Sequence, residues 1–194
     1  MMIMPSNNLS GICHYIAGKH PGSIGMLNTP LSWKNPPFYM PWALDNGCFT
    51  DWQPDKFRHY LKRSGLHHSP LWVAVPDIVA DAEATLKRWH KWHKQIDFPL
   101  AFVCQDGHEA KDVPKEAVCC FIGGSTDWKL NNAHKFKGVR KLLHIGRVTT
   151  LGRLGWCKEI GADSVDGSGF FKGNKKQKQD LIEFILGGNQ CYLF

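Results

Sequence analysis

Carboxylate and amide side chains stand at the ends of successive apolar runs in this sequence. Asp45, Asp77, Gln105 and Asp166 each end or closely follow such a run. If the runs are parallel strands of a barrel, their carboxyl ends meet at one mouth whatever their separation in the chain. Carboxylates accept hydrogen bonds from N–H groups, and an amide both donates and accepts. This combination suits guanine, which presents N–H donors beside a carbonyl acceptor.

Backbone groups at two further strand ends complete the candidate base-binding set. Gly123 and Gly124 follow one apolar run, and Ile145 and Gly146 end the next. The N–H groups of the glycine pair, bare of side chains, can donate to a carbonyl oxygen of a bound base. Glycines between a strand and a helix also cradle phosphate, so a phosphate site at the same place is an alternative.

The stretch 161–170 contains the candidate with the most direct chemical role. A short strand ends at Asp166, and Gly167 and Gly169 let the backbone turn and let a ligand approach closely. A carboxylate in a glycine-rich turn is also common without any function. Asp163, three residues earlier, is the competing candidate, but its place at the start of the strand favours a structural cap.

Apolar strands and helical patterns alternate along the chain and would position these residues. Strands are predicted at 12–17, 39–44, 71–75, 99–104, 117–122, 141–145 and 162–165, with 191–194 as an eighth candidate. Helices are predicted at 54–63, 81–95, 128–136, 151–160 and 177–186, and a long loop follows the first strand as far as residue 37. Unbroken apolar strands are typical of a parallel sheet covered on both faces. The pattern predicts an α/β fold, a compact (β/α)8 TIM-like barrel with trimmed helices, because the usual barrel takes about 250 residues. A doubly wound open sheet is the alternative.

The composition indicates one globular domain that covers residues 1–194. No apolar run approaches the roughly 20 residues that a membrane helix needs, and residues 1–10 lack the pattern of a signal peptide. A cytoplasmic location without a membrane partner is therefore predicted. The seven cysteines include no Cys-x-x-Cys pair, so we expect buried free thiols and no metal site.

The charge balance favours a polyanionic partner. Lys and Arg number 24 against 17 Asp and Glu, which leaves a net charge of +7, and a basic chain favours nucleic acid first. The sequence also contains eight tryptophans, and aromatic side chains on a basic surface can stack with nucleic-acid bases that have left the base stack. Arg147, Arg153 and Lys172 are the candidates for phosphate contacts. The basic run 172–178 is otherwise typical of a solvated helix start.

Taken in order, the strand-end motifs resemble those of the tRNA-guanine transglycosylase superfamily, and most of all its compact phage members that act on DNA. The family's Asp-Ser-Gly-Gly-Phe and Gln-Gly-Gly motifs are matched by Asp45-Asn46-Gly47-Cys48-Phe49 and Gln105-Asp106-Gly107. Its Gly-Gly base-contact loop, Met-Gly strand end and Asp-x-x-Asp segment are matched by Gly123-Gly124, Ile145-Gly146 and Asp163-Ser164-Val165-Asp166. These matches run over residues 45–170, most of the chain.

The resemblance implies base exchange without a cofactor. Asp166 would attack C1′ of a guanosine nucleotide, Asp45 would act as general acid and base, and Asp77, Gln105 and Gly124 would hold the base edge. A 7-deazaguanine base such as preQ0 would then reverse the step, a double displacement like that of a retaining glycosidase. The family's zinc site and its Pro-Thr-Arg sequence after the nucleophile are absent here. This departure favours DNA over tRNA as the polymer. If the protein is encoded by a phage, as the resemblance implies, its location would be the cytoplasm of the host.

Three other interpretations stay open at the level of sequence. A hydrolytic purine N-glycosidase would use the same barrel with water in place of the entering base. A barrel enzyme for a small phosphorylated metabolite would bind its phosphate at Gly123-Gly124. A nucleic-acid-binding module with an inactive site is the third. No sequence pattern indicates an oligomeric state.

Overall fold

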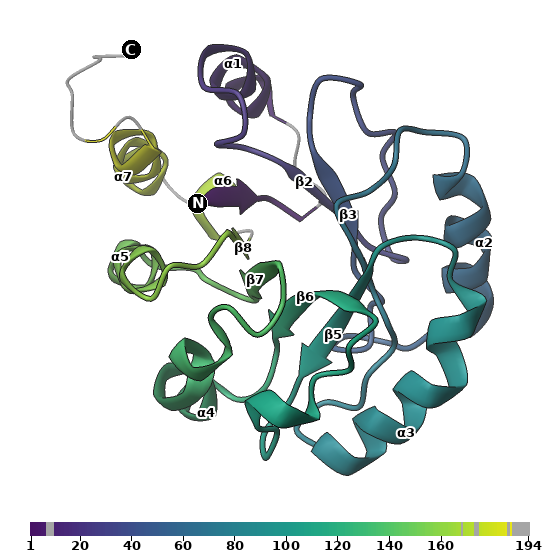
Figure 1. The fold of residues 1–194 in the computed structure, drawn as a ribbon. Helices are drawn as coiled ribbons and strands as arrows, with labels where there is room; N and C mark the ends of the chain where they lie inside the picture. The colour runs from purple at the N-terminus through teal and green to yellow at the C-terminus, as the bar shows by residue number, and fades with distance from the viewer. Residues whose placement is uncertain (7–9, 168, 173–174, 186, 188–194) are drawn as a thin grey trace.

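The computed structural model describes residues 1–6, 10–167, 169–172, 175–185 and 187 (Figure 1). Eight parallel strands form one sheet in the order β1-β8-β7-β6-β5-β4-β3-β2. They are β1 (Met2–Met4), β2 (Met26–Asn28), β3 (Trp42–Leu44), β4 (Val73–Ala74), β5 (Leu100–Cys104), β6 (Ala117–Ile122), β7 (Leu142–Ile145) and β8 (Ser164–Asp166). Parallel bridges from Ile3 to Ile24 and from Ser6 to Leu27 join the two edges of the sheet. The chain is therefore a compact (β/α)8 TIM-like barrel, as predicted.

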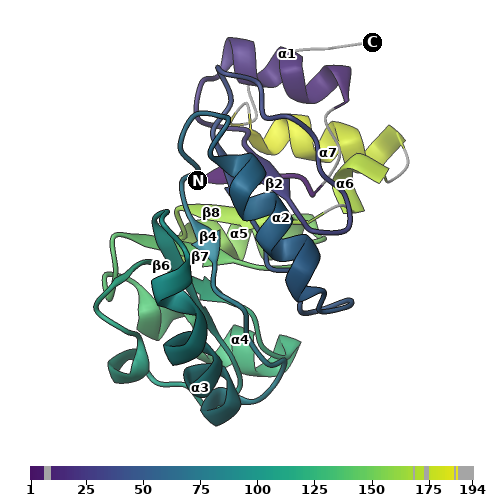
Figure 2. The ribbon, with the colours of Figure 1, turned by 90° about the vertical axis from the view of Figure 1, so that its right-hand side faces the viewer.

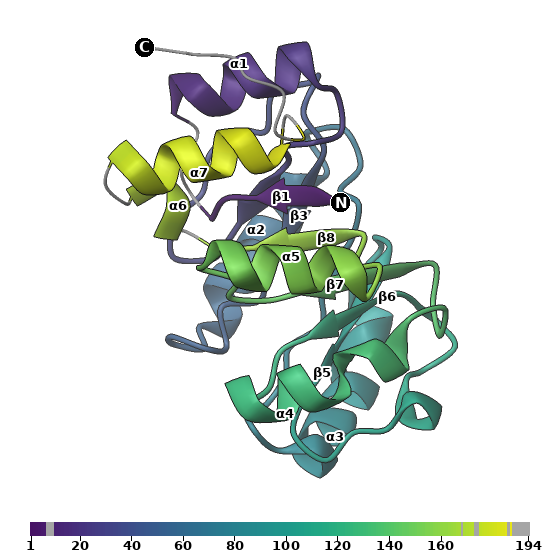
Figure 3. The ribbon, with the colours of Figure 1, turned by 90° about the vertical axis from the view of Figure 1, so that its left-hand side faces the viewer.

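Short helices cover the outside of the barrel. They are α1 (Gly11–Lys19), α2 (Pro54–Ser64), α3 (Ala82–Trp92), α4 (Thr126–Asn132), α5 (Leu151–Glu159), α6 (Gly169–Lys172) and α7 (Lys175–Ile185), with 3-10 turns η1 (His93–Gln95), η2 (Ala110–Asp112) and η3 (Ala133–Phe136). Figure 2 faces the side with α2 and α3, and Figure 3 the side with α4, α5 and α7. Helix starts have local causes: Pro54 opens α2, and the Asp81 side chain accepts from Ala84 N at 2.9 Å at the start of α3.

Two apolar layers hold the barrel together. The inner layer fills the barrel and consists of Met4, Leu27, Ala43, Trp72, Ala74, Ala101, Val103, Cys119 and Phe121. The outer layer packs the other faces of the strands beneath the helices. Trp72 has no exposed surface, and its indole centroid lies 5.4 Å from that of Phe121 and 4.8 Å from that of His144. The interior is thus packed below the mouth, which leaves the carboxyl ends of the strands as the place for a ligand.

The predicted strand at 12–17 is wrong, because this segment lies in helix α1. Cys13, Ile16 and Ala17 are its buried residues, and their spacing of three and four places them on one helical face. A short apolar run of this kind fits a strand and a buried helix equally well when sequence alone is considered.

The first two strands were missed. β1 is Met2–Met4, ahead of the first predicted element, and β2 is Met26–Asn28, inside the predicted loop. Each has only three residues, which is too short for a periodic pattern. The eighth candidate strand, 191–194, lies outside the described residues, and β1 is the strand that pairs with β8.

The other predicted elements are present with shifted ends. The predicted strands from 39–44 onward correspond to β3 through β8, and 117–122 has the same bounds as β6. The helices predicted at 81–95 and 128–136 each end in a 3-10 turn, and the last, predicted at 177–186, begins at Lys175. The six cysteines of the described residues are free thiols, and five of them are buried. In the same part of the chain, no helix is long and apolar enough to cross a membrane.

Candidate active site

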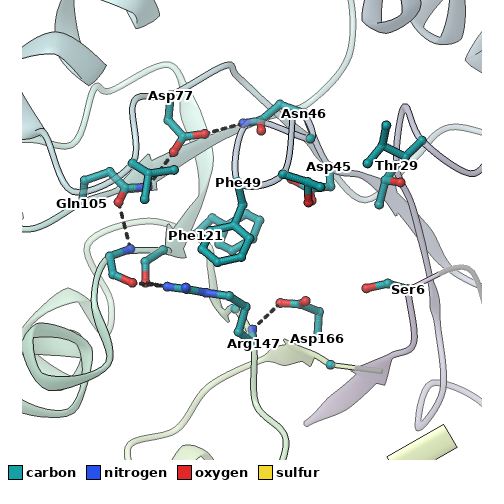
Figure 4. Close-up of a pocket in the computed structure, with 18 of the residues that line it drawn as sticks. Ser6, Thr29, Asp45, Asn46, Phe49, Asp77, Gln105, Phe121, Arg147 and Asp166 are labelled. Atoms are coloured by element: carbon teal, nitrogen blue, oxygen red, sulfur yellow. Dashed lines mark hydrogen bonds between the residues drawn. The ribbon is translucent and has the colours of Figure 1, made fainter. Parts of the chain in front are cut away.

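A cavity of about 340 Å³ opens at the carboxyl ends of the strands, a size typical of small-molecule sites (Figure 4). Its polar lining comes from segments that follow different strands: Ser6, Thr29, Asp45, Asn46, Asp77, Gln105, Gly123, Gly124, Gly146, Arg147 and Asp166. The structure thus brings together the predicted carboxylates, the amide and the glycines. Ile145 is fully buried in the outer layer and does not line the cavity.

On one side of the cavity, a carboxylate is held between two amides. Asp77 is 4% exposed; Asn46 Nδ2 donates to its Oδ1 at 2.8 Å, and Gln105 Nε2 donates to its Oδ2 at 2.6 Å. Burial raises the pKa of Asp77, and the hydrogen bonds, led by that from Asn46, oppose the shift. Each carboxylate oxygen keeps a further lone pair for a ligand N–H. We call Asn46, Asp77 and Gln105 the amide–carboxylate cluster.

The glycine pair is tied to this cluster. Gly124 N donates to Gln105 Oε1 at 3.0 Å, and Gly123 N donates to Cys104 O at 3.0 Å. The expected bare N–H donors therefore already have acceptors within the protein, because the loop after β6 packs directly on Gln105. A Cβ on Gly123 would lie 2.6 Å from Gln105 Nε2, and Gly124 has a φ of 53°, so both positions require glycine.

Asp166 ends β8, and its carboxylate faces the cavity. Oδ1 accepts from Arg147 N at 2.9 Å and lies 3.3 Å from His144 Nε2, while His144 Nδ1 lies 2.8 Å from Ser164 Oγ. The His144 ring therefore bridges Ser164 and Asp166 through its two nitrogens. From the described residues no hydrogen bond reaches Oδ2, which leaves that oxygen open to a ligand.

A buried lysine lies behind this carboxylate. Lys129 of α4 is 6% exposed, and its Nζ donates to Gly146 O. The same peptide group carries the Arg147 N–H that donates to Asp166, so the ammonium polarises the peptide toward the carboxylate. Burial lowers the pKa of Lys129 to about 8; Arg147 adds to the shift and Asp166 opposes it.

Asp45 has the environment of a general acid. It follows β3, and its backbone N–H donates to Asn28 O at 2.8 Å. Burial raises the pKa of Asp45 from 3.8 to about 7; the charges of Asp166 and then Asp77 add to this rise, and nearby backbone N–H groups oppose it. At neutral pH this carboxyl is therefore about half protonated. A protonated carboxyl beside an ionised one is the pairing that acid and nucleophile chemistry needs.

The predicted phosphate contacts have different outcomes. Arg147 turns into the mouth: its guanidinium donates to Gly123 O at 3.3 Å and to Gly124 O, and it lies 4.3 Å from the Phe49 ring centroid. Its φ of 60° is unusual for a residue with a side chain. Arg153 stands in the first turn of α5, outside the cavity lining. The side chain of Lys172 is not among those that the structure describes.

Two supporting residues were missed by the sequence reasoning. His144 carried a weak signal, as a polar residue inside an apolar strand one position before its end. Lys129 carried no signal, since a lysine on a short helix is expected to be solvated. Apolar residues complete the site: Phe121 lines the cavity with 8% exposure, and Leu31, Phe49 and Val79 stand exposed around it. Apolar walls beside one polar side suit a flat heteroaromatic ring.

Comparison with protein-family profiles and with curated proteins finds no significant match to this chain. The fold and the site define its class in structural terms: a TIM-like barrel whose mouth holds Asp166 and Asp45, the latter with a raised pKa, beside a buried amide–carboxylate cluster. Function is therefore inferred from this chemistry.

Proposed function

We propose that this protein is a nucleic-acid guanine transglycosylase, which exchanges guanine in DNA for a 7-deazaguanine base through a covalent glycosyl-aspartate intermediate. One observation carries the proposal. Asp45 and Asp166 line the same cavity, and burial together with the neighbouring carboxylates raises the pKa of Asp45 to about 7 while N–H donors hold Asp166. Breaking a purine N-glycosidic bond requires one acid and one nucleophile, and this pair supplies both.

The chemical steps follow from these roles. Asp166 Oδ2 forms a bond to C1′ while the bond from C1′ to the purine nitrogen breaks, and Asp45 gives its proton to the leaving guanine. Asp45 then takes the proton from the entering base, whose nitrogen attacks C1′ and displaces the Asp166 oxygen. Two displacements at one carbon restore the original configuration. The bonds and protons of both steps balance without a cofactor.

The amide–carboxylate cluster supports guanine as the base. In the proposed complex, Asp77 accepts hydrogen bonds from the N1–H and 2-amino groups, which guanine and 7-deazaguanines share and adenine lacks. Asn46 and Gln105 hold the carboxylate in place at 2.8 and 2.6 Å. A wrong base would leave buried polar atoms unpaired, which costs about 1–3 kcal/mol for each.

The choice of polymer rests on charge and on sequence. The net charge of +7 supports a polyanionic substrate, and the missing zinc pattern supports DNA in preference to tRNA. A small phosphorylated metabolite is the weaker candidate, because the Gly123 and Gly124 N–H groups that would bind its phosphate already donate within the protein.

The test is incubation of DNA or tRNA with the protein and isotope-labelled preQ0, followed by digestion and mass spectrometry of the nucleosides. We expect the label in DNA, release of one guanine for each base incorporated, and no incorporation by Asp166→Asn. Guanine release without incorporation would identify a hydrolytic glycosidase instead. Preferred labelling of tRNA would overturn the choice of polymer, and the absence of both release and incorporation would overturn the proposal itself.

A further inference from the structure

A second concave region lies between α2 and α3, on the side of the barrel that faces the viewer in Figure 2. We call it the basic groove, and its main lining residues are Trp52, Arg58, Lys87, Arg88, Lys91 and Trp92. It has a volume of about 460 Å³ and is separate from the cavity at the strand ends. Its lining therefore combines four cations with two indoles.

The positive charge of the groove is only partly neutralised within the protein. Arg58 lies 3.2 Å from Asp55, and Lys87 lies 2.5 Å from Glu83, but both pairs are exposed to solvent. Such surface pairs contribute little, so an anion with several charges can compete for them. Arg88 and Lys91 have no ion-pair partner among the described residues. The groove therefore has unused capacity for anions.

The two indoles hold the guanidinium groups in position. The ring centroids of Trp52 and Trp92 lie 5.3 Å apart, with their planes near perpendicular. The Arg58 guanidinium lies 4.7 Å from the Trp92 ring, and that of Arg88 lies 5.7 Å from the Trp52 ring. An arginine fixed by its flat face keeps its N–H edge available for a phosphate oxygen. Trp92 is only 4% exposed, so the floor suits a backbone rather than a stacked base.

The groove also lies directly beside the cavity, because the same two loops line both. Thr50 and Val79 line the cavity, whereas Trp52 and Ile78, one or two residues away in the chain, line the groove. Arg88 Nη1 donates at 2.8 Å to the backbone carbonyl of Asp77. A polymer whose base occupies the cavity therefore has the groove within reach of its adjacent backbone.

We propose that the basic groove binds the phosphodiester backbone of the polynucleotide beside the nucleotide whose base enters the cavity. The inference rests on the proposed function, because that function requires a polymer at the mouth. Nucleic acid fits better than an anionic membrane, since a narrow chain reaches the floor between two helices whereas a flat lipid surface contacts only their exposed edges. The phosphates contribute affinity and position, and the cavity contributes base choice.

The test measures binding of a fluorescein-labelled single-stranded oligonucleotide by anisotropy over a series of salt concentrations. The variant is Lys91→Glu, and the matched control is Lys115→Glu, the same charge change at an exposed lysine before β6, at the opposite end of the barrel. We expect Lys91→Glu to weaken binding about tenfold and to reduce the salt slope by about 0.7 for one lost phosphate contact on a single strand. The control should change affinity by less than about twofold. Circular dichroism establishes that both variants are folded, and Lys91→Gln should give an intermediate effect.

The outcomes separate the groove from the proposed function. Equal effects of Lys91→Glu and the control would overturn the inference, even if the wild-type protein exchanges bases. Loss of binding to phosphatidylserine vesicles in Lys91→Glu with unchanged oligonucleotide affinity would also overturn it, in favour of a membrane. Binding that depends on Lys91, without base exchange or guanine release by the wild-type protein, would support the groove and overturn the transglycosylase proposal.

Discussion

Asp163 directly precedes β8 and Asp166 ends it, and the surroundings of these two aspartates differ. At the amino end, Asp163 Oδ2 accepts from Leu143 N at 2.8 Å and lies 3.4 Å from Lys137 Nζ. At the carboxyl end, Asp166 Oδ1 accepts from Arg147 N, and the carboxylate lines the cavity. The first carboxylate completes a strand and an exposed ion pair, whereas the second is buried beside two other carboxylates.

The same contrast holds for cations at the two ends of the barrel. Arg140, just before β7, donates to the carbonyls of Val113, Pro114 and Val139, so its guanidinium serves the backbone. Lys129 lies behind the carboxyl ends with a pKa that burial lowers to about 8. Polar groups at the amino ends of the strands therefore stabilise the fold. Those at the carboxyl ends are buried at a cost in stability, which is typical of groups that serve a function. The predictions below test this division.

Replacing the carboxylate that faces the cavity tests the division most directly. Asp166→Asn keeps the shape and the hydrogen bond from Arg147 N but removes the nucleophile, so base exchange should fall by roughly 10³-fold or more. The melting temperature should change little. Exchange of labelled base into DNA and a thermal melt measure the two effects.

Trapping of the covalent intermediate tests which carboxylate bonds to the sugar. Wild-type protein trapped with DNA should give an adduct on a denaturing gel, and peptide mapping should place it on Asp166. An adduct on Asp163 or Asp45, or full activity of Asp166→Asn, would contradict the assignment and erase the contrast between the two ends of β8.

The pH dependence of exchange tests Asp45. Burial, with added repulsion from Asp166 and Asp77, raises the pKa of Asp45 to about 7, and only the protonated form can give its proton to the leaving base. The value of kcat/KM should therefore fall about tenfold for each pH unit above 7. Asp45→Asn should lower activity and abolish this fall of kcat/KM at high pH. The same fall in the variant would show that another residue is the general acid.

The free energy of unfolding should also depend on the ionisation of Asp45, and it should decrease as the pH rises. The folded protein holds the proton of Asp45 more tightly than the unfolded chain, where the pKa is near 3.8. Its contribution to stability is therefore present below pH 4 and is lost as the pH rises through about 7. Asp45→Asn should stabilise the protein more at pH 8 than at pH 5 in urea unfolding. An equal difference at both pH values would show that burial does not raise the pKa of Asp45.

Asp77 should govern base choice rather than bond cleavage. Asp77→Asn replaces one acceptor with a donor, which leaves the guanine edge imperfectly paired at a cost of about 1–3 kcal/mol, or roughly fivefold to 150-fold. Competition between guanine and adenine analogues measures the loss of selectivity. Unchanged selectivity in a folded variant would argue against the role of the amide–carboxylate cluster.

Lys129 should position Asp166 through the peptide between Gly146 and Arg147. Lys129→Met removes the ammonium but fills the same space, so kcat should fall about fivefold, equivalent to about 1 kcal/mol, with little change in KM. Stability should change little, because removal of a buried charge offsets the loss of the donor to Gly146 O. Lys129→Arg should restore part of kcat. A change in KM alone would indicate a binding role instead.

Asp163 should show the smallest effect on chemistry. Asp163→Ala leaves Leu143 N without this acceptor and should lower the free energy of unfolding by about 1–3 kcal/mol, with exchange within twofold of wild type. Asp163→Asn keeps an acceptor and serves as the control, with a smaller loss. Equal loss of exchange in Asp163→Ala and Asp166→Asn would remove the distinction between the two ends.

The sequence by itself predicted an α/β barrel and placed six of its eight strands, together with the residues at their carboxyl ends. The runs that became β3 through β7 are mainly apolar, and each is followed by polar residues, proline or glycine, so these strand ends could be predicted from the sequence. Parallel topology then requires these ends to converge, which is why the sequence alone groups Asp45, Asp77, Gln105 and Asp166, and all four line the cavity.

Only the tertiary structure decided which groups are free and which are engaged. Gly124 N was expected to donate to a ligand, but it donates to Gln105 Oε1, a residue 19 positions away in sequence. The contacts of His144 with Asp166 and of Lys129 with Gly146 O likewise join separate segments. Such pairings depend on the closure of the barrel, because burial and distance, rather than residue type, set the pKa of Asp45 and the partner of each polar atom.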